Sequence, residues 1–122
     1  MHELAIANTI VTTVLHEIER QDLPPVKAVV VRVGALSGVV PEALQFNFEA
    51  ITIDTPLAHT KLEIEKIPVQ GKCRKCSREF TVKNYLFVCP SCQSGQIQVT
   101  QGEELDIAYL EVEDGHDGKI DG

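Results

Sequence analysis

The sequence predicts an α+β fold in which two helices pack on a three-stranded sheet, with a four-cysteine module inserted into that sheet. Three observations lead to this prediction. Apolar residues recur at helical spacing in two early segments. Three other segments, one between the two helical segments and two after them, are rich in β-branched residues or alternate apolar and charged residues. All four cysteines lie in one short stretch between the last two of those segments.

The two helices are expected in the first half of the chain. From Leu4 to Ile18 apolar residues return every three or four positions, and the segment 21–25, QDLPP, ends this helix. A second helix is expected within residues 37–51, SGVVPEALQFNFEAI. Pro41 fits its first turn, where the missing proline amide would have no partner in any case.

Three segments are expected to form strands. Residues 26–36, VKAVVVRVGAL, are rich in β-branched residues, as a buried strand is. Residues 62–69, LEIEKIPV, and 104–112, ELDIAYLEV, alternate apolar and charged side chains, which is typical of strands with one face in water.

These elements predict how the chain is organised. Residues 1–70 and 99–113 are expected to form the α+β domain, and residues 71–98 a separate small module. The polar, glycine-rich residues 114–122 are expected to form a flexible tail.

Composition narrows the class of protein. The 122 residues suit one ordinary domain with a small appendage, and a hydrophobic share of 43% is enough for a core. No run approaches the roughly 20 apolar residues of a membrane span, and the first residues do not resemble a signal peptide. We therefore expect a cytoplasmic protein with no membrane contact, in which four cysteines are metal ligands and not disulfides.

The formal net charge of −7 is unevenly spread. Residues 1–70 carry a net charge of −4, residues 71–97 carry +4, and residues 98–122 carry −7. An acidic chain with a small basic island is a poor general binder of nucleic acid.

The cysteines form two CxxC pairs, CRKC and CPSC, separated by 12 residues that are expected to form a hairpin. Two such pairs at this spacing are typical of a zinc ribbon, in which four thiolates hold a structural zinc ion. So short a module cannot bury enough apolar surface to fold alone, and metal binding would supply the energy. The expected zinc ligands are Cys73, Cys76, Cys89 and Cys92.

Other chemistry for these cysteines is less well supported. A rubredoxin-like iron centre uses the same four sulfurs but usually has glycine after each pair, where this chain has Ser77 and Gln93. A thioredoxin-like redox site needs one reactive pair without a second pair beside it. No catalytic motif accompanies the cysteines, so we do not expect an enzyme.

The N-terminal sequence MHE allows two interpretations. Glu3 can be a first-turn acid that favours the positive end of the helix dipole, with His2 incidental. Alternatively, the amine of Met1, the first amide nitrogens and the His2 imidazole can form a metal site. A nitrogen-rich, planar site suits Ni(II) or Cu(II), whereas tetrahedral thiolates suit zinc. The Glu3 carboxylate could bind axially or orient His2 instead.

The chain as a whole resembles the HypA/HybF family of hydrogenase-maturation nickel metallochaperones. The resemblance rests on MHE at the N-terminus, VRVGALSGVVPEALQFNFE in the middle and CRKC…CPSC, and it extends to about Val112. It implies that His2 takes part in binding nickel as cargo, and that the cysteines hold zinc. Our reading of the MHE segment adds the Met1 amine and Glu3 to the expected nickel site in the α+β domain.

The resemblance also implies partners: the GTPase HypB and the precursor of the [NiFe]-hydrogenase large subunit. A monomer or weak homo-oligomer is expected. The rival hypotheses are a zinc-ribbon module that binds nucleic acid through its basic island, and a purely structural zinc scaffold.

Overall fold

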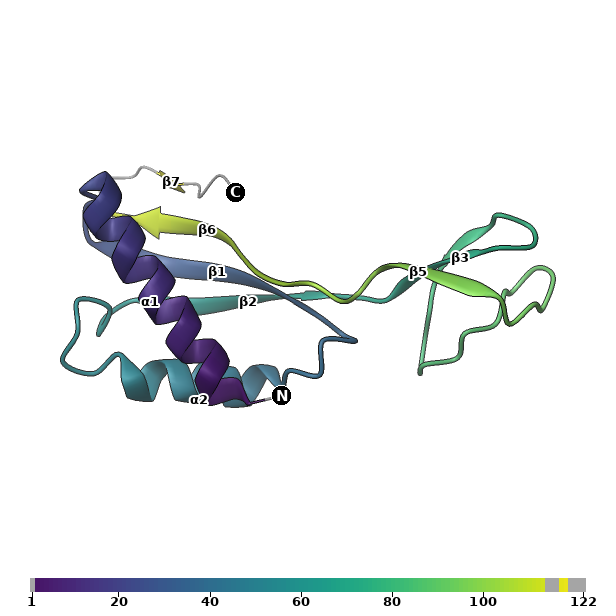
Figure 1. The fold of residues 1–122 in the computed structure, drawn as a ribbon, viewed down its shortest axis with the longest axis horizontal. Coiled ribbons are helices and arrows are strands. Elements are labelled where there is room, and N and C mark those ends of the chain that lie inside the picture. The colour runs from purple at the N-terminus through teal and green to yellow at the C-terminus, as the bar shows by residue number, and fades with distance from the viewer. Residues whose placement is uncertain (1, 114–116, 119–122) are drawn as a thin grey trace.

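The computed structural model describes residues 2–113 and 117–118 and shows a two-part molecule (Figure 1). A larger α+β body carries both helices, and a small ribbon module projects from one end of its sheet. The predicted fold class is confirmed. Along the chain the elements are α1 (Glu3–Gln21), β1 (Val26–Gly34), α2 (Pro41–Ile51), β2 (Lys61–Ile67), β3 (Gln70–Cys73), β4 (Glu79–Thr81), β5 (Ile97–Gln101), β6 (Leu105–Val112) and β7 (Asp117–Gly118).

The sheet of the body has the strand order β2-β1-β6-β7. β1 pairs in parallel with β2, from Ala28 opposite Lys61 to Gly34 opposite Ile67, and antiparallel with β6. The three predicted strands therefore form this sheet, and the two-residue β7 adds a fourth at its edge, beside Leu110. Residues 114–116 and 119–122 of the predicted tail lie outside the described residues.

The core of the body lies between the sheet and the two helices. β1 is central, so both of its faces are largely buried, which is why it is nearly continuous in valine. α1 and α2 contact each other, and both contribute residues to the core that they share with the sheet. The fully buried side chains that the helices contribute to this core are Ala7, Val14, Leu44 and Phe48.

Both helices begin and end where local chemistry permits. Asp22, with φ of 50°, caps the C-terminal end of α1 in the left-handed conformation, and its amide donates to the carbonyl of Ile18. Pro24 and Pro25 follow directly. α2 begins at Pro41, as predicted, because the first helical position needs no amide donor.

The ribbon module has its own antiparallel sheet with the order β4-β3-β5. The predicted hairpin between the two cysteine pairs is wrong. That stretch supplies only β4, which pairs back on β3, while the other neighbour of β3 is β5, after the second pair. The chain crosses into the module through Pro68 and Val69 and returns through Gly102.

The junction between the two parts is closely packed. The Leu36 amide donates to the carbonyl of Gly102 at 2.7 Å, and the Gly34 amide donates to that of Glu104 at 2.7 Å. A Cβ atom on Gly34 would clash with the Gly102 carbonyl, and Gly102 itself has φ of 123°. Both positions therefore require glycine, one for space and one for conformation.

Candidate metal sites

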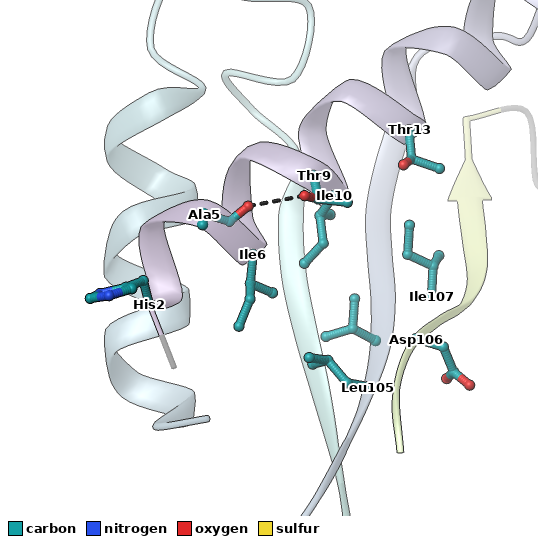
Figure 2. A pocket seen from close by; sticks show the side chains of 10 residues that line it. His2, Ala5, Ile6, Thr9, Ile10, Thr13, Leu105, Asp106 and Ile107 are labelled. Atoms are coloured by element: carbon teal, nitrogen blue, oxygen red, sulfur yellow. Dashed lines mark hydrogen bonds between the residues drawn. The ribbon is translucent and has the colours of Figure 1, made fainter. Parts of the chain in front are cut away.

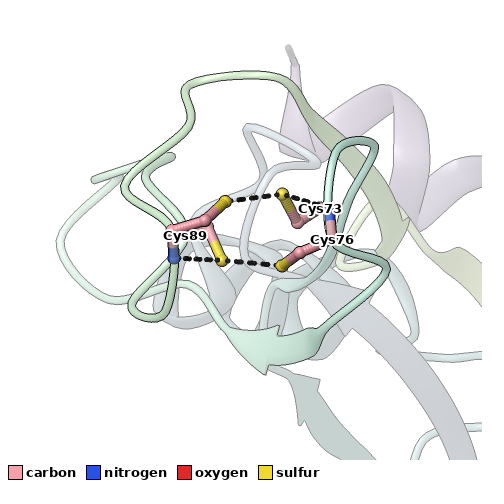
Figure 3. A group of neighbouring side chains, drawn as sticks. Cys73, Cys76 and Cys89 are labelled. Carbon is pink, nitrogen blue, oxygen red and sulfur yellow. Dashed lines mark hydrogen bonds between the residues drawn. The ribbon is translucent and has the colours of Figure 1, made fainter.

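The four cysteines converge on one point, as the spacing predicts. Their sulfur atoms all lie within 4.8 Å of one another (Figure 3). Across the two pairs, Cys73 Sγ is 3.5 Å from Cys92 Sγ, and Cys76 Sγ is 3.5 Å from Cys89 Sγ. Four sulfurs on a zinc ion, each about 2.3 Å from it, would be about 3.8 Å apart. The observed set therefore fits a tetrahedral ion.

The two CxxC turns have the same backbone geometry. In each turn the amide of the residue after the second cysteine donates to the carbonyl of the first cysteine: Ser77 to Cys73 and Gln93 to Cys89, both at 2.9 Å. Ser77 and Gln93 have φ of 67° and 64°. Glycine is common at such positions because it adopts positive φ without strain. Its absence here therefore does not separate zinc from iron, since the turn forms without it.

Backbone amides point at the sulfurs. The amides of Ser91 and Cys92 lie 3.4 and 3.5 Å from Cys89 Sγ, and the Cys76 amide lies 3.4 Å from Cys73 Sγ. Hydrogen bonds of this kind favour a thiolate over a thiol. They lower the pKa of Cys73, mainly through the Cys76 amide, and lower that of Cys89 to about 6, mainly through the Cys92 amide.

Cys76 behaves in the opposite way. The Arg78 amide lowers its pKa, but the neighbouring Cys89 sulfur and burial outweigh this, and the pKa rises to about 11. Packed sulfurs cannot all ionise easily side by side, because like charges repel. A bound cation removes this conflict. The donor set is thus one that a divalent, thiophilic metal stabilises.

At the other candidate site, His2 is exposed and is the N-cap residue of α1. Its carbonyl accepts the first helical hydrogen bond, from the Ile6 amide at 3.2 Å. Met1 lies outside the described residues, so its predicted amine ligand is not described. Since the first amides of a helix have no carbonyl partner within it, the nitrogens of His2 and Glu3 are outside the helical ladder.

Glu3 joins the starts of the two helices. Its Oε2 atom accepts a hydrogen bond from the Val40 amide at 3.0 Å, and Val40 is the N-cap residue of α2. This bond and its own amide lower the pKa of Glu3. The Glu3 carboxylate therefore pairs the amide of the N-cap residue of α2, as the glutamate of a capping box does. Nothing in the sequence signals this contact, because the two residues are 37 positions apart.

His2 also lies at one end of an open groove of about 650 Å³ under α1 (Figure 2). Its walls are mostly apolar: Ile6 and Ile10 from the helix, and Leu105 and Ile107 from β6. Sequence reasoning missed this groove, because it arises where a helix crosses a strand about a hundred residues later.

Among residues 2–113 and 117–118, the four cysteines are the only group of three or more His, Cys, Asp or Glu side chains placed to share one ion. The side chains of His2 and Glu3 thus do not form such a group with others. His16 and His59 are exposed elsewhere, and His116 is outside the described residues.

Comparison with known proteins identifies the family. A protein-family model described as hydrogenase/urease nickel incorporation, metallochaperone, hypA matches residues 1–112. The chain belongs to the HypA family. A hydrogenase maturation factor HypA from Geobacter metallireducens is 42% identical over 113 residues, spanning 93% of this chain and all of the relative. One from Geotalea uraniireducens is 43% identical over 115 residues, again 93% of this chain and all of the relative.

Solved structures agree with the fold. The solution structure of the Ni metallochaperone HypA from Helicobacter pylori matches with a TM-score of 0.64 at 24% identity, covering 92% of this chain and 97% of that one. A second HypA solution structure gives a TM-score of 0.68 at 24% identity, covering 92% and 96%. HypA proteins are metallochaperones of hydrogenase maturation and not enzymes. No helix in the described part of the chain could cross a bilayer.

Proposed function

We propose that this chain binds Ni(II) at its N-terminus and delivers it to the [NiFe]-hydrogenase large-subunit precursor in the cytoplasm. The observation that carries the proposal is the family match over residues 1–112, a family of nickel incorporation, in a chain that exposes His2 at the start of α1. The nickel ligands would be the Met1 amine, the His2 imidazole and backbone nitrogens of His2 and Glu3. Such a set favours the planar geometry of Ni(II).

The contact between Glu3 and Val40 bears on the role of Glu3. Because its carboxylate already accepts the Val40 amide, Glu3 would contribute its backbone nitrogen and would hold the N-terminus in place through its side chain. An exposed terminal site also suits a carrier, since a partner's ligands can reach the ion and displace its ligands one at a time.

Zinc is the metal proposed for Cys73, Cys76, Cys89 and Cys92. The sulfur spacing fits its tetrahedron, and a site closed by four thiolates has no open position for substrate. Zinc would hold the ribbon module together.

The GTPase HypB would work alongside this chain in delivering the nickel ion. The family match favours this metallochaperone function over a nucleic-acid-binding module or a scaffold.

Calorimetric titration with Ni(II) tests the nickel site, using wild type, His2→Ala and, as control, His16→Ala. Both histidines are exposed on or next to α1, so the variants differ only in the site removed. We expect one nickel per chain, bound at least about tenfold more weakly by His2→Ala, which corresponds to about 1.4 kcal/mol. Equal affinity of His2→Ala and wild type would refute the proposed site.

A second variant tests the amine ligand. One residue added before Met1 moves the free amine away from His2, so nickel affinity should fall if the amine binds and should not change if only the imidazole does.

Metal analysis of the purified protein should give one zinc per chain, and none after all four cysteines are replaced. Nickel transfer to hydrogenase precursor and to urease apoprotein would identify the acceptor, since the family description names both.

A further inference from the structure

The strand β7 covers only part of one edge of β6. It pairs antiparallel with β6 at two positions, Gly118 opposite Leu110 and Asp117 opposite Glu111. β1 pairs with the other edge of β6 along its whole length. In the described part of the chain, residues 105–108 of β6 therefore have no strand on the β7 side. An open edge of this kind is a template for another extended segment.

The same part of β6 forms a wall of the groove beside His2. Leu105 and Ile107 line the groove from β6, and Ile6 lines it from α1 (Figure 2). These three side chains pack against the core but are only partly buried. The open strand edge and the uncovered apolar wall are thus in one place.

A continuation of β7 would run toward this place. Because β7 is antiparallel to β6, each further residue of the same strand would lie opposite an earlier residue of β6. Three residues in strand conformation, 119–121, extend about 10 Å. That length is enough to reach from Leu110 to Ile107.

Alternation along the strand determines which way Ile120 would point. Leu110 belongs to the core, and opposite residues of an antiparallel pair share a face, so Gly118 is on the helix side of the sheet. Ile120 is two residues further along and would have the same face. In the sequence, Ile120 is also the only apolar side chain among residues 113–122.

A bulge in β6 brings Ile107 to the helix side as well. One extra residue in β6, Ala108, shifts the register of β6 against β1. In a regular strand Ile107 and Leu110, three residues apart, would face opposite sides. Here both pack with the core. Ile120 would therefore lie beside Ile107 in the groove.

The charges on the other face permit this pairing. It places Asp121 near Asp106, and like charges on neighbouring strands repel each other. The Asp106 carboxylate is already paired, since it accepts hydrogen bonds from Arg32 Nε at 2.9 Å and Arg32 Nη2 at 2.7 Å. The guanidinium thus offsets the repulsion that Asp121 would meet.

We infer that residues 119–121 extend β7 along the open edge of β6 and place Ile120 in the groove between α1 and β6. This segment, here called the strap, covers the apolar wall beside His2. It has to leave before any other segment can add to this edge, so it is an autoinhibitory contact. The strap lies beyond residues 1–112, which the family model matches, so it is not part of the family pattern. The inference does not depend on nickel binding.

NMR of the zinc-loaded full chain tests the inference. Wild type should show nuclear Overhauser contacts between the methyl groups of Ile120 and those of Ile107. In Ile120→Asp a charged side chain replaces the apolar one. The amides of residues 105–108 that point away from β1 should then exchange with solvent at least about fivefold faster.

Two control variants and one reference amide accompany this measurement. Lys119→Ala lowers the net charge as much as Ile120→Asp does, but at a position that faces away from the groove, so exchange should equal that of wild type. Ile120→Leu keeps an apolar side chain and should also behave as wild type. The Val29 amide, in the central strand β1, should exchange equally in all variants.

Four results would overturn the inference. The first is the absence of methyl contacts between Ile120 and Ile107. The second is exchange at residues 105–108 that Ile120→Asp leaves unchanged, or that Lys119→Ala accelerates equally. The third is faster Val29 exchange in Ile120→Asp, because the segment would then belong to the core and could not act as a removable strap. The fourth is contact between copies in a mixture of labelled and unlabelled protein, which would assign the groove to a second copy.

Discussion

The body and the ribbon module keep their structure by different means. The body buries a continuous core of valine, leucine and phenylalanine between two helices and a sheet. Apart from Gly71, the ribbon module has few buried residues: Cys73, Val82 and Cys89, with Val69 at its entry. Two of these are the proposed metal ligands. The body thus has an apolar core to stabilise it, whereas the ribbon module would depend on metal ligation.

Removing the metal should have the largest effect and should separate the two parts. With a chelator, or in Cys89→Ser, the ribbon module should lose its ordered structure, because few apolar contacts remain to hold it. The body should stay folded. Amide NMR spectra check this: signals from β3 to β5 should collapse to unfolded positions while those of α1 and β1 persist. Loss of both sets together would show that the body also depends on the metal.

A core substitution should have a smaller effect, confined to the body. Phe48 is fully buried, so Phe48→Ala should cost about 3–5 kcal/mol of unfolding free energy. Phe46→Ala, two residues earlier on the exposed face, should change it by no more than about 0.5 kcal/mol at low protein concentration. Denaturant unfolding measures both, with zinc content per chain expected to equal that of wild type. Similar losses in the two variants would contradict the assignment of the core.

The smallest effect should come from the contact between the helix starts. The folded state lowers the pKa of Glu3, so its bond to Val40 contributes fully above the ordinary glutamate pKa and is lost as pH falls through the lowered value. Hydrogen exchange of the Val40 amide, corrected for intrinsic rate, should therefore show reduced protection only at pH values below the ordinary glutamate pKa. Glu3→Gln should remove this pH dependence while keeping an acceptor oxygen. An unchanged pH profile in Glu3→Gln would show that another group protects Val40.

The sequence predicts features that depend on local pattern. Helix α1, expected over Leu4–Ile18, extends only a few residues further at its C-terminal end. The position of Pro41 and the convergence of the four cysteines are confirmed as well. Each follows from a short-range rule: helical periodicity, the absent proline amide, or the reach of a CxxC turn.

Features that depend on contacts between distant segments are not predictable in this way. The parallel pairing of β1 and β2, the pairing of β3 with β4 and β5, and the groove beside His2 join residues far apart in the chain. The hydrophobic periodicity of a segment does not indicate which strands it pairs with. The hairpin prediction is wrong for the same reason, since the stretch between the cysteine pairs finds its partner outside itself.

The close backbone contact between Gly34 and Gly102 determines how much of the chain would have to be moved to transplant the ribbon module into another protein. A ribbon module cut out at residues 71–98 would lose the Val69 carbonyl, which accepts the Val82 amide at 2.8 Å. It would also lose Gly102, whose backbone packs closely against Gly34. A graft into another scaffold would have to carry both connecting segments and would need a host strand with glycine opposite them. The separable piece is therefore larger than its cysteines suggest.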